Sequence, residues 1–115
     1  MVTVRGLVRE MQIEIRDTPD LLPDRAAECL NRLTALLGNC NEEIRIADAE
    51  YAAVLLKHLG SEEAANRAKI RAETTPEYQR KREARDTKEL AVELIRSLKY
   101  FLKAKADEYQ MARHQ

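Results

Sequence analysis

Apolar side chains in the middle of the chain recur at alternating steps of three and four residues, the heptad pattern of packed helices. The series is Ala26, Leu30, Leu33, Leu37, Cys40, Ile44, Ala47, Tyr51, Val54 and His58. This spacing keeps one apolar face pointing in one direction along a helix and predicts a second helix packed against it. The series keeps its phase through Gly38, and a helical Gly costs only about 1 kcal/mol relative to Ala. We therefore expect one helix over residues 24–59, although the local composition also allows a bend or a break at Gly38.

A short helix is predicted before this long one. Apolar residues at helical spacing over residues 3–15 indicate a helix that Thr3 caps. The alternation over residues 12–17 also fits a strand, but an isolated strand would have no partner. Pro23 then suits the first turn of the long helix, where a missing backbone donor does no harm.

The end of the long helix is expected at Leu59, with Gly60 in the left-handed position that often follows a helix. Ser61 is then predicted to cap a short third helix, with Glu62 and Glu63 near its positive amino end. The sequence therefore places a tight connection around residues 60–63.

A fourth helix is predicted over residues 76–112. Thr75, Pro76 and Glu77 supply a cap residue, a first-turn proline and a first-turn acid. Its apolar side chains fall on one side at 100° per residue, and this face is expected to pack: Ala84, Ala91, Leu94, Ile95, Leu98, Phe101, Leu102, Tyr109 and Ala112.

A basic stripe lies beside that apolar face. Its members fall within an arc of about 80° on a helix, and they are Lys81, Arg85, Lys88, Arg96, Lys99 and Lys103. Cations along one helix face can follow a phosphate backbone or bind an acidic partner. The competing interpretation is a solvated or paired face, because acids such as Glu93 stand within reach on the same helix.

Composition supports helices and a reduced, intracellular setting. Hydrophobic residues make up 44% and charged residues 35%, with three Gly and three Pro, a balance typical of helical bundles. The net charge of zero divides unevenly, since residues 1–66 carry 7 bases and 12 acids while residues 67–115 carry 13 and 8. No apolar run reaches transmembrane length and no signal peptide is apparent. We therefore expect a cytoplasmic protein without membrane contact.

No residue pattern predicts catalysis, a cofactor or a bound metal. Cys29 and Cys40 would lie about 16 Å apart on one helix, too far for a disulfide. Four residues from His58 stand Val54 and Glu62, so a His58–Glu62 pair is the one alternative to a capping or core-edge histidine, which is the favoured interpretation. We expect a protein that is not an enzyme.

The carboxy-terminal two thirds resembles small helical proteins of tailed bacteriophages and prophages, which are often encoded near early recombination and replication genes. The resemblance lies in Ala49-Glu50-Tyr51, Thr75-Pro76-Glu77-Tyr78, Leu98-Lys99 and Glu108-Tyr109 with Arg113. It implies an accessory protein that acts on nucleic acid or on a protein machine.

The expected fold is all-α and forms a single domain over residues 1–115. Two long helices, 24–59 and 76–112, form an antiparallel hairpin through the short third helix, and the first helix covers one end. Exposed apolar surface favours a homodimeric bundle. The expected seam is Leu30, Leu33, Leu37, Ile44, Tyr51, Val54, Leu94, Leu98 and Leu102.

Three functional hypotheses follow. The first is association with a protein partner through a helical surface, linked to DNA recombination or replication. The second is sequence-tolerant nucleic-acid binding by the basic stripe. The third is a structural or scaffold oligomer.

Overall fold

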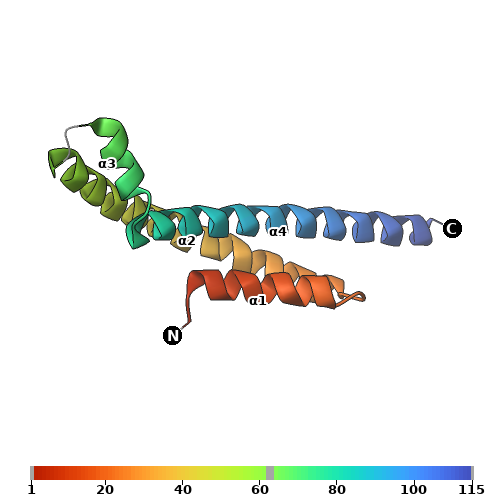
Figure 1. Cartoon of the computed structure of the whole chain (residues 1–115). Helices are drawn as coiled ribbons and strands as arrows, with labels where there is room; N and C mark the ends of the chain where they lie inside the picture. The colour runs from red at the N-terminus through yellow and green to blue at the C-terminus, as the bar shows by residue number, and fades with distance from the viewer. Residues whose placement is uncertain (1, 62–63, 115) are drawn as a thin grey trace.

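Helices make up most of the part of the chain that the structure describes. A computed structural model describes residues 2–61 and 64–114. Within them lie four helices, α1 (Val4–Asp17), α2 (Pro23–Ser61), α3 (Ala65–Ala72) and α4 (Pro76–Arg113), and no strand. The molecule is elongated, with extents of 74 × 28 × 22 Å (Figure 1). The expected all-α class is confirmed, and so are both long helices to within two residues at each end.

The two long helices run antiparallel, with α3 in the connection between them (Figure 1). Two ion pairs fix their direction: Arg80 lies 3.3 Å from Glu50, and Arg85 lies 2.6 Å from Asp48. From the first ion pair to the second, the residue number increases on α4 and decreases on α2, as an antiparallel arrangement requires. α3 packs against α2.

Helix α1 packs against both long helices rather than only covering one end. The Arg5 guanidinium lies 3.0 Å from Glu83 of α4. At the other end of α1, Arg25 of α2 donates to Glu14 at 2.6 Å. α1 therefore runs parallel to α4 and antiparallel to α2, and the middle of the molecule is a three-helix bundle.

The core forms where these three helices meet. One row of the predicted heptad is buried along α2 at steps of seven residues: Ala26, Leu33, Cys40 and Ala47. Val8 and Met11 of α1 and Ala91, Ile95 and Leu98 of α4 complete the core with Cys29. The second heptad row lies at its margin, because Leu30, Leu37 and Ile44 are half-buried, although Tyr51 of the same row is buried. Val54, the next member of the first row, is half-buried. Leu94 and Leu102 of the expected seam are also half-buried and pack against this core.

Two predictions about the end of α2 were wrong. Gly60 lies inside the helix, and no glycine in the described residues has a positive φ. Ser61 is the last residue of α2 and donates its hydroxyl to the carbonyl of His58, so it does not cap the next helix. α3 instead follows Ala64, which provides no side-chain cap. The predicted roles of Glu62 and Glu63 lie outside the described residues.

The other helix boundaries follow the expected capping chemistry. The Thr3 hydroxyl accepts from the backbone N–H of Gly6 at 2.9 Å, and the Thr75 hydroxyl accepts from that of Tyr78 at 3.4 Å. α1 extends to Asp17, two residues past the predicted end. At Gly38 the helix is continuous, so the alternative of a break there is wrong.

Replacing Leu33 by Ala should destabilise the protein by about 2–5 kcal/mol, because the truncation leaves a cavity in the three-helix core. Leu33 is 0% exposed, whereas Leu56 on the same helix is 71% exposed. The control Leu56→Ala should change stability by no more than about 0.5 kcal/mol. Urea unfolding followed by circular dichroism measures both, and equal losses would contradict this core.

Replacing Gly38 by Ala should stabilise the protein by about 0.5–1 kcal/mol. A Cβ at Gly38 would meet no heavy atom within 4 Å, so the helix gains propensity without a clash. Gly6→Ala is the matched control, since its Cβ would lie 3.1 Å from the Thr3 hydroxyl that caps α1 and should bring a smaller gain. A lower midpoint for Gly38→Ala in the same assay would argue against a regular helix there.

Candidate interaction surfaces on helix α4

The amino-terminal half of the predicted basic stripe faces α2. The Lys81 ammonium lies 4.5 Å from the centroid of the Tyr51 ring, and that ring lies 5.3 Å from the Tyr78 ring. Burial raises the pKa of Tyr51, so the phenol stays neutral. The expected packing of Tyr51 against the fourth helix is confirmed, and Lys81 is part of that contact.

Arg85 and Lys88 also belong to the α2–α4 contact. Arg85 donates to Oδ2 of Asp48 at 2.6 Å, while Oδ1 of Asp48 is buried without a hydrogen-bond partner. Lys88 is half-buried, and its charge acts on the buried thiol of Cys40. Arg85 is therefore already paired with α2, whereas Lys88 has no ion pair or hydrogen bond among the described residues.

The carboxy-terminal half of the stripe is open. Arg96 pairs with Glu93 at 2.6 Å, as their spacing predicts. Lys99 and Lys103 are exposed and have no ion pair or hydrogen bond among the described residues. Tyr100 stands between them with 78% of its surface exposed. We call Arg96, Lys99, Tyr100 and Lys103 the distal basic patch.

The last turns of α4 project beyond the rest of the molecule (Figure 1). Every residue from 103 to 114 is exposed, and residues 103–113 extend about 16 Å at 1.5 Å per residue. The predicted packing of Tyr109 and Ala112 was therefore wrong. Neither α1 nor α2 reaches these turns, so their apolar side chains have nothing to pack against.

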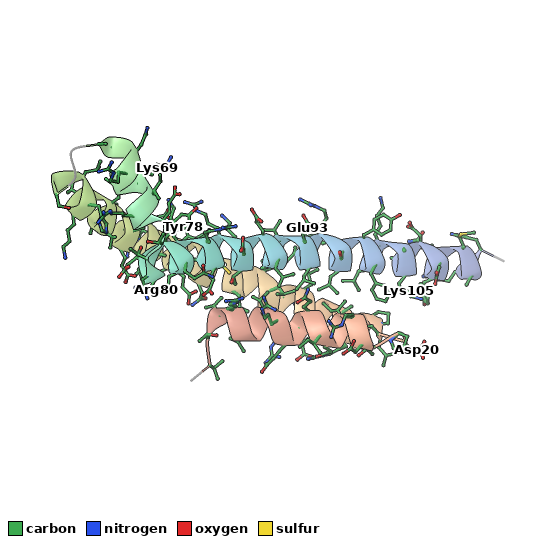
Figure 2. All side chains as sticks on the ribbon, viewed as in Figure 1. Asp20, Lys69, Tyr78, Arg80, Glu93 and Lys105 are labelled. Atoms are coloured by element: carbon green, nitrogen blue, oxygen red, sulfur yellow. The ribbon has the colours of Figure 1, made fainter. Side chains whose placement is uncertain are left out.

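An aromatic residue lies between two cations on this projecting end. Lys105, Tyr109 and Arg113 are four residues apart and form one ridge of the helix. The Arg113 guanidinium lies 5.9 Å from the Tyr109 ring centroid, and the Lys105 ammonium lies 3.4 Å from Glu108. Figure 2 shows Lys105 on the side of α4 that, nearer the start of the helix, packs against α1 and α2. Glu93 is on the other side of α4. We call these three residues the projecting ridge.

A groove opens at the other end of the three-helix bundle, where the start of α1 leaves space beside α2 and α4. Its volume is about 360 Å³, and it is lined by Thr3, Arg5, Glu43, Ile46, Ala47, Glu50, Arg80, Glu83, Ala84 and Thr87. Ile46 is 44% exposed, so the groove offers apolar surface. Carboxylates of Glu43, Glu50 and Glu83 stand around it.

The acids of the groove differ in what they already bind. Hydrogen bonds from Gln79 and Arg5 hold the pKa of Glu83 below its ordinary value, so it stays ionised. Glu50 pairs with Arg80. Glu43 is exposed and has neither an ion pair nor a hydrogen bond within the described residues. The groove therefore keeps one carboxylate free for a cation.

Sequence analysis did not find this groove, because it depends on where α1 lies. The lining residues come from three helices that are far apart in the chain. We expected α1 only to cover one end, so the sequence did not predict that these residues would come together. One signal was present in the sequence: the acidic amino half and the basic carboxy half attract each other. Arg5 with Glu83 departs from that trend, since the base lies in the acidic half.

The cysteines and His58 occupy structural positions. Cys29 and Cys40 are buried free thiols, and burial raises the pKa of both. His58 is half-buried in the last turns of α2. Across residues 2–61 and 64–114, no group of three or more His, Cys, Asp or Glu side chains is placed to hold a metal ion. Over the same ranges, no helix combines the length and apolar character needed to cross a membrane.

Comparison with protein-family models, with curated proteins and with solved structures gives no match to this chain.

Proposed function

We propose that this chain is a non-enzymatic accessory protein of the kind carried by tailed bacteriophages, which acts by packing the projecting ridge of α4 against another protein. The observation that supports this most directly is the exposed end of α4, residues 103–114. Proteins of recombination or replication machinery are the partners that the phage resemblance implies.

A helix end without tertiary contacts is weakly stabilised in water. Most helical stability in proteins comes from packing of an apolar face, yet 65% of Tyr109 and 66% of Met111 are exposed here. Aromatic residues and Arg are enriched at the centres of protein interfaces, where they contribute much of the binding energy. The projecting ridge combines both residue types on a segment that is free to enter a partner.

A photo-reactive benzophenone amino acid in place of Tyr109 should cross-link to protein when the variant is expressed in a bacterial host and irradiated. Tyr100 is the matched position, because it is also an exposed tyrosine of α4. Nine residues at 100° each place its side chain on the opposite side of the helix, about 180° away. Mass spectrometry of the cross-linked bands identifies which positions touch protein.

The outcomes at the two positions separate the hypotheses. A protein cross-link from position 109 and none from position 100 supports the proposed function. Equal protein cross-linking from both positions, or none from either, would sink it. Cross-links from position 100 to nucleic acid alone would favour the next candidate.

A second candidate function is binding of nucleic acid by the distal basic patch. The observation in its favour is Tyr100, whose exposed ring comes between Lys99 and Lys103 in the sequence and lies on the same side of α4. Neither lysine has an intramolecular ion pair in the part of the chain described. Bases stack on exposed aromatic rings, and lysines beside the ring can hold the backbone phosphates.

Under this second candidate, the double variant Lys99→Glu with Lys103→Glu should bind single-stranded DNA more weakly, with a shallower dependence of affinity on salt. Each lost phosphate contact reduces the slope by about 0.7 for a single strand. The control Lys57→Glu with Lys69→Glu makes the same change of charge at two other exposed lysines. Fluorescence anisotropy at several salt concentrations measures both, and equal weakening in the two variants would leave only non-specific attraction.

A further inference from the structure

We propose that the partner of the projecting ridge is a second copy of this chain, and that the ridge docks in the groove between α1, α2 and α4. This inference rests on the proposed function and names its partner. Copies joined in this way form a head-to-tail chain, which is a specific form of the structural or scaffold oligomer in the third hypothesis.

The two surfaces suit each other in apolar character. The ridge offers the ring of Tyr109, which is 65% exposed. The groove offers Ile46, Ala47 and Ala84, and it lies where the three-helix bundle is incompletely closed. A helix laid there would bury the aromatic ring against small and branched side chains, as at helix–helix contacts elsewhere in this fold.

The charges also match in sign and spacing. Lys105 and Arg113 flank Tyr109 and are eight residues apart, which is about 12 Å along a helix. On α2, Glu43 and Glu50 flank the apolar positions and are seven residues apart, or about 10.5 Å. Lys105 already pairs with Glu108 and Glu50 with Arg80, so the new pair that this docking forms is Arg113 with Glu43. Only Glu43 lacks an ion pair among the described residues.

The ridge cannot fill the groove of its own molecule. Both lie along α4, where the groove reaches Thr87 and the ridge begins at Lys105. These two positions are eighteen residues apart, which is about 27 Å of continuous helix. Two different surfaces that join head to tail without closing a ring form open chains. The zero net charge of the protein adds no long-range repulsion between copies.

Sedimentation equilibrium over a wide range of protein concentration tests this docking. The mean mass of the full chain should rise past twice the monomer mass as concentration increases. Tyr109→Asp removes the ring from the ridge, and Ile46→Asp places a charge in the groove. Each variant alone should remain monomeric, with its apparent dissociation constant raised at least tenfold.

An equimolar mixture of the two variants gives the sharpest result. Tyr109→Asp keeps an intact groove and Ile46→Asp keeps an intact ridge, so the mixture should recover dimers and no longer species. Tyr100→Asp and Ile13→Asp are the matched controls and should assemble as the unchanged chain does. Ile13 is 47% exposed, close to the 44% of Ile46. Glu43→Lys, at an exposed position outside the core, should also raise the dissociation constant at least tenfold. It replaces Ile46→Asp as the groove variant if Ile46→Asp fails to fold.

Three outcomes would overturn the inference. They are a monomer at every concentration, a mass that stops at a closed dimer, and loss of assembly in the controls equal to that in the variants. A monomer whose position 109 still cross-links to a different protein would refute self-docking and leave the proposed function standing. A monomer without any cross-link from position 109 would refute both.

Discussion

The fold depends on burying one row of small and medium side chains along α2. Ala26, Leu33, Cys40 and Ala47 follow one another at steps of seven residues and point into the same core. Small residues at three of these four positions let neighbouring helices approach closely, and Leu33 fills the space between them. Since α1 and α4 both pack on this row, they must lie on one side of α2. Elsewhere α2 exposes apolar side chains as well as charged ones, among them Ile46 and Leu56.

The limits of this row also determine where the molecule is incomplete. It begins near the start of α2, so the turns of α4 after Leu102 have no helix opposite them. α1 begins at Val4, and beside its start the wedge between α2 and α4 stays open as the groove. The projecting ridge and the groove are therefore two consequences of one mismatch, because the three helices overlap only in the middle of the molecule.

Sequence periodicity predicted the helices well because it records which side chains are buried along each one. It found both long helices, the continuity through Gly38 and the contact of Tyr51 with α4. It failed where the answer depended on relative position: Tyr109 continues the apolar pattern of α4 but extends past the end of α2. Gly60 and Ser61 have the composition of a helix end, yet α2 continues through both, because a helical Gly costs only about 1 kcal/mol relative to Ala and local composition alone does not stop a helix. For the same reason, the sequence identified the members of the basic stripe but not which of them contact α2.

That distinction changes how the charge of α4 should be interpreted. Lys81 contacts the Tyr51 ring and Arg85 pairs with Asp48, so these two cations are engaged within the molecule, whereas Lys99 and Lys103 have no ion pair among the described residues. Tyr100, Arg96 and Lys103 lie about 120–180° around α4 from Tyr109, and Lys99 lies about 80° from it, at 100° per residue. A partner on the projecting ridge would therefore leave most of the distal basic patch uncovered. An assembly joined through the ridges would keep most of each distal patch exposed, and repeating these patches along a chain would increase avidity for an extended anionic polymer without any stronger individual contact.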